Sequence, residues 1–110
     1  MKKILLLILI LSFSNASASE FSTNFTKEKF EKAQKEGITV VVYSWNKFCS
    51  TCAKQKPILL QAKKDFQNVL FLDFEHTKNK SIAKYLNIDF WSTIVVYKNN
   101  NEINKGIGLY

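Results

Sequence analysis

The chain has 110 residues, a length that suits one domain, and a formal net charge of +7. All sixteen basic residues are lysines, and they are scattered among glutamates and aspartates rather than clustered with arginines. This pattern is typical of a solvated basic surface and argues against nucleic-acid binding. After residue 11, no apolar stretch is long enough to span a bilayer.

The first 18 residues have the three-part layout of a secretory signal peptide. A lysine pair follows the initial methionine, an apolar run covers residues 4–11, and an Ala-x-Ala sequence ends at Ala18. The run is about half of the roughly 20 residues that a spanning helix needs, which disfavours an uncleaved membrane anchor. We therefore expect a signal peptide at 1–18, cleaved after Ala18, and an exported, periplasmic domain at 19–110.

Apolar periodicity and turn residues predict alternating strands and helices in that domain. Thr26 is a typical helix N-cap, and Gly37 is a typical helix stop. In chain order we expect a short edge strand at 21–25, a helix at 26–36, a buried strand at 38–43, a helix at 49–66 that Pro57 kinks, a buried strand at 69–74, a short helix at 80–86, a strand at 93–97, a turn at 99–101 and a weaker strand at 102–107.

This order predicts an α/β fold with helices on both faces of a mixed central sheet of four or five strands. The core strands should be parallel, and the last two strands should form a C-terminal antiparallel hairpin. For the 49–66 helix, we expect the inward side to consist of the apolar residues Ile58, Leu59, Ala62 and Phe66.

The only two cysteines, Cys49 and Cys52, lie three positions apart. A disulfide between them would close a tiny loop and constrain the unfolded chain little, so the pair is better explained by chemistry than by stability. Cys49 follows a buried strand and opens a helix, where free N–H groups and the helix dipole stabilise a thiolate. We expect Cys49 to attack a substrate disulfide and Cys52 to resolve the mixed disulfide. Lys47 and Lys54 are close enough in sequence to add positive charge.

The segment from Trp45 to Cys52, Trp-Asn-Lys-Phe-Cys-Ser-Thr-Cys, resembles the active-site segment of the thioredoxin family. Phe48 stands where a second Trp is common, and Pro57 matches the proline that bends the active-site helix. The resemblance covers nearly all of the mature chain. It implies a thioredoxin-like fold, a protein-disulfide oxidoreductase with Cys49 and Cys52 as catalytic residues, and no cofactor or metal. It also implies a substrate groove, formed by Trp45, Phe48, Trp91, Ser92 and Thr93.

The sequence departs from the family pattern at three places. Ser92 replaces the usual cis-proline, and because a cis bond before serine costs about 3–4 kcal/mol, a trans peptide is favoured. Tyr43 stands where cytosolic thioredoxins bury an aspartate that accepts the proton of the second cysteine. The sequence ends at Tyr110, where the family continues into a last helix.

The expected function is thiol–disulfide exchange with cysteine-containing protein substrates outside the cytoplasm. The strongest oxidants of the thioredoxin family often hold a His between the cysteines, so the resemblance, together with the lack of that His here, favours a reductant or an isomerase. We expect a membrane thiol carrier to supply its electrons and the protein to work as a monomer. Two alternatives stay open: a thioredoxin-fold binding module without exchange activity, and a Cu(I)-handling protein. We expect His76 to be a solvated loop residue. We expect Asp73 and Glu75 to lie at the surface or at a strand end; the alternative is that one of them is a substitute proton acceptor for Cys52.

Overall fold

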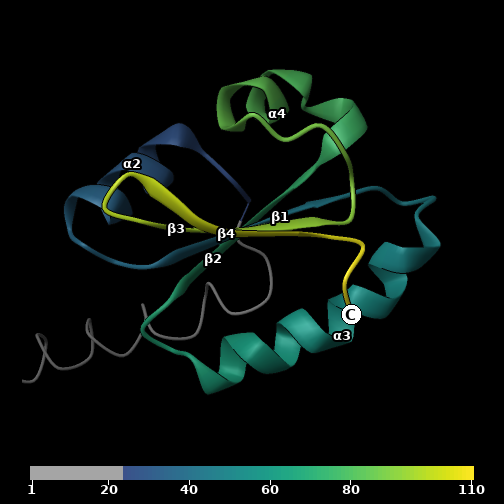
Figure 1. The fold of residues 1–110 in the computed structure, drawn as a ribbon, viewed down its shortest axis with the longest axis horizontal. Coiled ribbons are helices and arrows are strands. Elements are labelled where there is room, and N and C mark those ends of the chain that lie inside the picture. The colour runs from purple at the N-terminus through teal and green to yellow at the C-terminus, as the bar shows by residue number, and fades with distance from the viewer. Residues whose placement is uncertain (1–23) are drawn as a thin grey trace, which may run out of the picture.

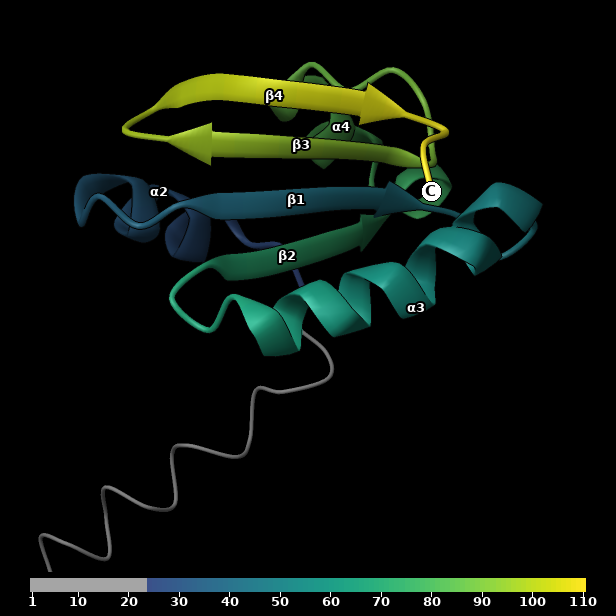
Figure 2. The same cartoon turned by 60° about the horizontal axis from the view of Figure 1, so that its bottom comes forward.

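The computed structural model of the protein describes residues 24–110, and the predicted signal peptide lies outside them (Figures 1 and 2). The helices are α2 (Lys27–Lys35), α3 (Ser50–Asp65) and α4 (Lys80–Leu86), with a 3-10 turn η1 (His76–Lys78) before α4. The strands are β1 (Val40–Trp45), β2 (Leu70–Glu75), β3 (Thr93–Lys98) and β4 (Asn101–Ile107). None of the helices in this part of the chain has the length and apolar character needed to cross a membrane.

The strands form one mixed sheet in the order β2-β1-β3-β4. β1 pairs in parallel with β2, while β3 runs antiparallel to both β1 and β4. The mixed sheet and its C-terminal hairpin confirm the predicted fold. The expected parallel pairing of the core strands holds for β1 and β2 but not for β3, which runs antiparallel to β1. Of the predicted 21–25 strand, only the end is described: Asn24 forms a single parallel bridge to Asp73.

Local signals at the helix and hairpin ends act as the sequence predicts. The hydroxyl of Thr26 accepts a hydrogen bond from the N–H of Lys29 at 3.2 Å and caps α2. The β3–β4 turn uses Asn99 and Asn100 at φ 51° and 67°, the left-handed pair that a tight hairpin requires. Asn100 also donates its N–H to the buried side-chain oxygen of Gln34, which ties the hairpin to α2.

The hydrophobic core lies on the sheet face that α2 and α4 cover (Figure 1). Every second strand residue points into it, so Val40, Val42 and Val95 have no exposed surface. Aromatic rings fill the space toward α2: Phe30 packs edge-to-face on Tyr97, with ring centres 4.9 Å apart. This face supplies most of the apolar burial that holds the fold together.

On the opposite face, α3 is the one helix among residues 24–110 (Figure 2). This helix is packed much more lightly than the core side of the sheet. Only Cys52 and Gln55 are buried in this 16-residue helix. The predicted inward side was wrong in part, since Ile58 and Phe66 are 51% and 57% exposed. The inward side instead follows the helical spacing of Cys52, Gln55 and the partly buried Leu59, which places Ile58 away from the sheet.

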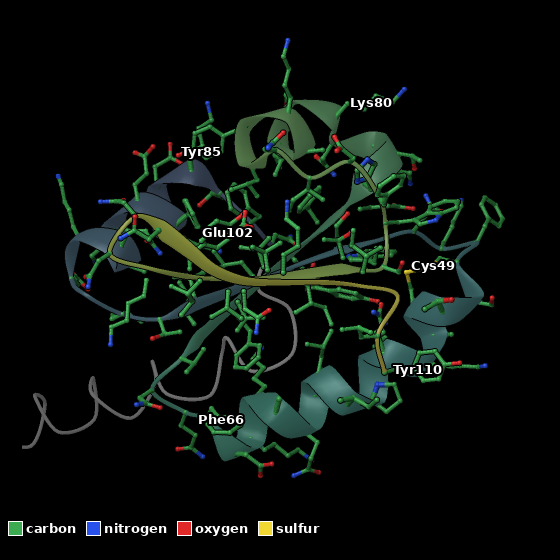
Figure 3. All side chains as sticks on the ribbon, viewed as in Figure 1. Cys49, Phe66, Lys80, Tyr85, Glu102 and Tyr110 are labelled. Atoms are coloured by element: carbon green, nitrogen blue, oxygen red, sulfur yellow. A yellow bond between two sulfur atoms is a disulfide. The ribbon has the colours of Figure 1, made fainter. Side chains whose placement is uncertain are left out.

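The residues after β4 turn back toward α3 (Figure 3). Gly108, at φ 70°, donates its N–H to the carbonyl of Ser92 at 2.8 Å. Leu109 then accepts a hydrogen bond from Gln55, and Lys54 lies 5.0 Å from the centre of the Tyr110 ring. No helix follows β4 within residues 24–110, so α3 is the one helix on this face of the described domain.

Candidate active site

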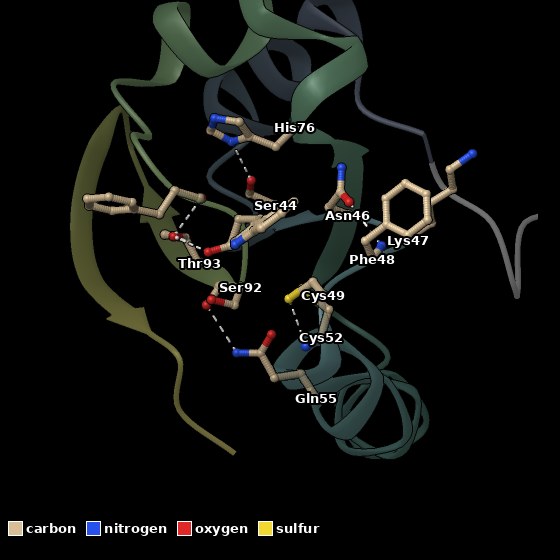
Figure 4. Close-up of a disulfide and its surroundings, with 12 residues drawn as sticks. Ser44, Asn46, Lys47, Phe48, Cys49, Cys52, Gln55, His76, Ser92 and Thr93 are labelled. Carbon is tan, nitrogen blue, oxygen red and sulfur yellow. Dashed lines mark hydrogen bonds between the residues drawn. A yellow bond between two sulfur atoms is a disulfide. The ribbon is translucent and has the colours of Figure 1, made fainter.

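Cys49 and Cys52 form a disulfide at the N-terminus of α3, with their sulfurs 2.33 Å and their Cα atoms 5.2 Å apart (Figure 4). Cys49 is the N-cap residue, in an extended conformation at φ −95° and ψ 107°. Its Sγ accepts a hydrogen bond from the backbone N–H of Cys52 at 3.1 Å. A sulfur in this position satisfies one of the free N–H groups of the helix, and a thiolate would do so more strongly.

The turn that presents Cys49 is built on Asn46. The side-chain oxygen of Asn46 accepts from the N–H of Phe48 at 2.9 Å, and its carbonyl accepts from the N–H of Cys49 at 3.1 Å. Its amide nitrogen donates to the hydroxyl of Thr77 at 2.6 Å, which ties the turn to η1. Asn46 is 5% exposed, so these bonds are shielded from water and stabilise the turn that leads from β1 to Cys49.

The two cysteines differ in their access to solvent. Cys52 is 5% exposed, whereas Cys49 is partly exposed at the mouth of the helix. Beside it, Phe48 is 80% exposed and offers an apolar surface to an approaching partner. An accessible first sulfur and a buried second one fit the predicted roles of attacking and resolving thiol.

Comparison with known proteins agrees with this geometry. A family model described as Thioredoxin matches residues 21–109. The chain belongs to the thioredoxin family. It is 28% identical over 91 residues to a Rickettsia bellii protein named Thioredoxin, covering 81% of this chain and 87% of that protein. It is 25% identical over 81 residues to a Thioredoxin H-type of Fagopyrum esculentum, covering 74% of this chain and 70% of that protein.

Solved structures show the same fold at lower identity. The crystal structure of Trxlp from Edwardsiella tarda has a TM-score of 0.75 at 20% identity, covering 80% of this chain and 87% of that one. Fasciola hepatica thioredoxin has a TM-score of 0.68 at 22% identity, covering 78% and 85%. These matches confirm the predicted thioredoxin-like fold.

In this thioredoxin-family protein, a groove of about 580 Å³ lies between α3 and the sheet. Both cysteines line it, together with Tyr43, Trp45 and Asp73 from the two central parallel strands. Asp73 is the single acidic residue in the lining, while the basic ones are Lys47, Lys56 and Lys63. The groove therefore joins the sulfurs to one half-buried carboxyl group.

Tyr43 and Asp73 carry the strongest electrostatic signature of the groove. Burial, and then the negative charge of Asp73, raise the pKa of Tyr43 to about 12. Burial also raises the pKa of Asp73, against the hydrogen bond from Trp45 Nε1 at 3.4 Å and the charges of Lys63 and Lys56. Tyr43 donates its hydroxyl to the carbonyl of Cys52 at 3.1 Å, so it supports the active-site helix from below.

The predicted substrate-groove residues occupy three different environments. Trp45 lines the groove beside the cysteines, whereas Phe48 and Trp91 are exposed at the surface. Thr93 is 1% exposed, and its hydroxyl donates to the carbonyls of Phe90 and Trp91 at 2.8 and 3.3 Å. Thr93 is therefore too buried to contact a substrate, and its hydroxyl stabilises the conformation of the 90–92 loop.

Ser92 holds an unusual backbone position in that loop. It is buried at φ 55°, a left-handed conformation that costs a non-glycine residue about 1–2 kcal/mol. Residues 24–110 contain no cis peptide bond, so the Trp91–Ser92 bond is trans. The Ser92 carbonyl is occupied by the N–H of Gly108 and the side chain of Gln55.

Lys54 and Pro57 occupy exposed positions on α3. Lys54 Nζ donates to the hydroxyl of Tyr110 at 3.3 Å, so the ammonium group of Lys54 contacts the last residue of the sequence. Pro57 is exposed, and α3 continues past it to Asp65. Among residues 24–110, no three His, Cys, Asp or Glu side chains gather as a metal site would require.

His76 differs from its predicted role as a solvated loop residue. It is the first residue of η1 and is partly buried. Its Nδ1 lies 2.9 Å from the hydroxyl of Ser44 (Figure 4). Its ring stacks on Phe74 at a centroid distance of 6.1 Å. Ser44 has no exposed surface and lies between β2 and β3 in the sheet. A serine within an apolar strand is the sequence signal that predicts a buried partner for it.

Proposed function

We propose that the protein is a thiol–disulfide oxidoreductase that acts on protein disulfides outside the cytoplasm, mainly as a reductant. The observation that carries the proposal is the position of Cys49 Sγ, which caps α3 and accepts the N–H of Cys52. The same contact stabilises the thiolate of the reduced pair and so favours attack by Cys49 near neutral pH.

In the reductive direction, the Cys49 thiolate attacks one sulfur of a substrate disulfide, and that S–S bond breaks. A mixed disulfide forms, and the other substrate sulfur leaves as a thiolate that takes a proton from water. Cys52 then loses its thiol proton and attacks Cys49 Sγ, which breaks the mixed disulfide and releases the second substrate sulfur. Two electrons have passed from the cysteine pair to the substrate.

The proton of Cys52 needs an acceptor inside the domain, and Asp73 fits this role. The groove is lined by both cysteines, and Asp73 is its acidic residue. Because the pKa of Asp73 is raised, it lies closer to the pKa of a thiol, which favours proton transfer between the two groups. Water in the groove can carry the proton between the two groups. Asp73→Asn should then slow substrate reduction about tenfold or more, whereas the exposed variant Asp65→Asn should leave it unchanged.

The sequence supports the place and direction of the reaction. The first 18 residues have the layout of an export signal, which supports a place outside the cytoplasm. Ser50 and Thr51 separate the cysteines, without the His that strong oxidants of the family often hold there, and this supports the reductive direction. An exported reductant needs a source of electrons, which we propose to be a membrane thiol carrier. A measured reduction potential near the reducing end of the family range would support this direction, and one near the oxidising end would reverse it.

Trapping tests the exchange itself. Cys52→Ala should accumulate mixed disulfides through Cys49, because the second step is blocked, while Cys49→Ala serves as the matched control and should trap none. The unmodified protein should reduce insulin disulfides. If Cys52→Ala traps nothing and insulin is not reduced, the protein is a binding module, and a tight one-to-one Cu(I) complex would point to copper handling.

A further inference from the structure

Gln55 carries a buried side-chain amide next to the disulfide. The exchange reaction proposed above gives this amide no role. Gln55 is 1% exposed on the inward side of α3, one helical turn after Cys52. Its nitrogen donates to the carbonyl of Ser92 at 3.1 Å and to the carbonyl of Leu109 at 2.9 Å. Two carbonyl oxygens can be satisfied only by the NH₂ end, so these contacts fix which end of the amide is nitrogen and which is oxygen.

The oxygen of this amide has no partner. Gln55 Oε1 is fully buried and accepts no hydrogen bond in the oxidised protein. Figure 4 shows it turned toward the cysteine pair, while the nitrogen points to Ser92. The two donated bonds prevent the amide from rotating to another donor. Buried acceptors without a partner are uncommon in folded proteins, so this one calls for an explanation.

We propose that Gln55 Oε1 accepts a hydrogen bond from the Cys52 thiol when the disulfide is reduced, and thereby stabilises the dithiol form. The inference rests on the redox cycle proposed above. A dithiol donor supplies two electrons and the S–S bond breaks. Cys52 Sγ takes up a proton and becomes an S–H donor, while Cys49 becomes a thiol or thiolate at the mouth of the helix.

Burial singles out Cys52 as the donor. Cys52 is 5% exposed and lies at i−3 to Gln55 on the same helix face, whereas Oε1 cannot be reached by a substrate from solvent. The oxidised sulfur has no hydrogen to donate, so the bond exists only in the reduced state. A contact made in one redox state shifts the equilibrium toward that state, and Gln55 therefore makes the disulfide easier to reduce.

The test is the reduction potential of Gln55→Met, measured by equilibration with glutathione. Methionine keeps the length of the side chain but has no amide oxygen. Losing one hydrogen bond to the thiol should shift the equilibrium toward the disulfide about five- to tenfold, which is about 20–30 mV lower. The contacts to Ser92 and Leu109 are lost in both redox states, so they should largely cancel.

Gln61→Met is the matched control, because Gln61 is an exposed glutamine of the same helix that pairs with Asp65. Its potential should equal that of the unmodified protein. A second measurement needs no variant: in the reduced protein, the infrared S–H stretch of Cys52 should lie below that of a free thiol. A Gln55→Met potential equal to the control, or an unshifted S–H band, would overturn the inference.

These readings are separate from the proposed function. Glutathione equilibrates with the cysteine pair whether or not protein substrates are reduced. A failed insulin assay with a shifted potential would therefore remove the proposed activity and keep the role of Gln55. An active protein with an unshifted potential would do the reverse.

Discussion

Tyr43 and Asp73 lie directly opposite each other on the parallel strands β1 and β2, and both side chains line the groove that contains the cysteine pair. The tyrosine hydroxyl supports the first turn of α3, and the carboxyl group is held by Trp45. The acid of this site thus comes from the strand next to the one that leads to the cysteines.

Asp73→Asn should stabilise the protein at neutral pH. Burial raises the pKa of Asp73, so the folded state binds its proton more tightly than the unfolded chain does. The charged form therefore costs stability at neutral pH, and this cost disappears as the pH falls below the ordinary aspartate pKa of about 3.9. Urea unfolding should show a higher midpoint for the variant at pH 7 and a shrinking difference in acid. A lower midpoint at pH 7 would contradict this account.

Tyr43→Phe should lower the free energy of unfolding by about 1 kcal/mol, because the hydrogen bond from the tyrosine hydroxyl to the Cys52 carbonyl is lost. With a pKa of about 12, the hydroxyl is neutral throughout the usable range, so the loss should not depend on pH between neutral and mildly basic conditions. Tyr110→Phe, at an exposed position, should change stability little. Equal effects of the two variants would argue against a supporting role for Tyr43.

Substitutions at Ser92 should follow the order of their backbone preferences. Glycine accepts the observed φ of 55° without strain, so Ser92→Gly should be neutral or stabilise by up to about 1 kcal/mol. Proline fixes φ near −65°, so Ser92→Pro should destabilise by more than about 1 kcal/mol. Thermal unfolding of the two variants side by side checks the order, and a Pro variant as stable as the Gly variant would contradict it.

His76→Ala should destabilise the protein by about 1–3 kcal/mol, since it leaves the fully buried Ser44 hydroxyl without its partner. Ser44→Ala should cost less, because the partly exposed imidazole can reach water. Adding Ser44→Ala to His76→Ala should then recover part of the loss. A double-mutant cycle in urea measures this coupling, and strict additivity would rule it out.

The sequence allowed the fold and the cysteine pair to be predicted because their signals are local. Caps such as Thr26, the β-branched run of β1 and the Cys-x-x-Cys spacing act within a few residues. The inward side of α3 was less predictable, because the polar residue Gln55 is buried there while the apolar residue Ile58 is exposed. A pattern of apolar residues alone therefore points to the wrong side of the helix. The pairs Tyr43–Asp73 and Ser44–His76 depend on strand register, which a single sequence does not specify.

The light packing of α3 has a consequence for how the molecule moves. With two buried residues among sixteen, the helix contributes little of the apolar contact that β1, β3 and α2 share. Its backbone amides should therefore exchange with deuterium through a local opening that leaves the sheet intact, at a free energy below that of global unfolding. The segment that bears the sulfurs would then be able to adjust to differently shaped partners while the rest of the domain remains closed.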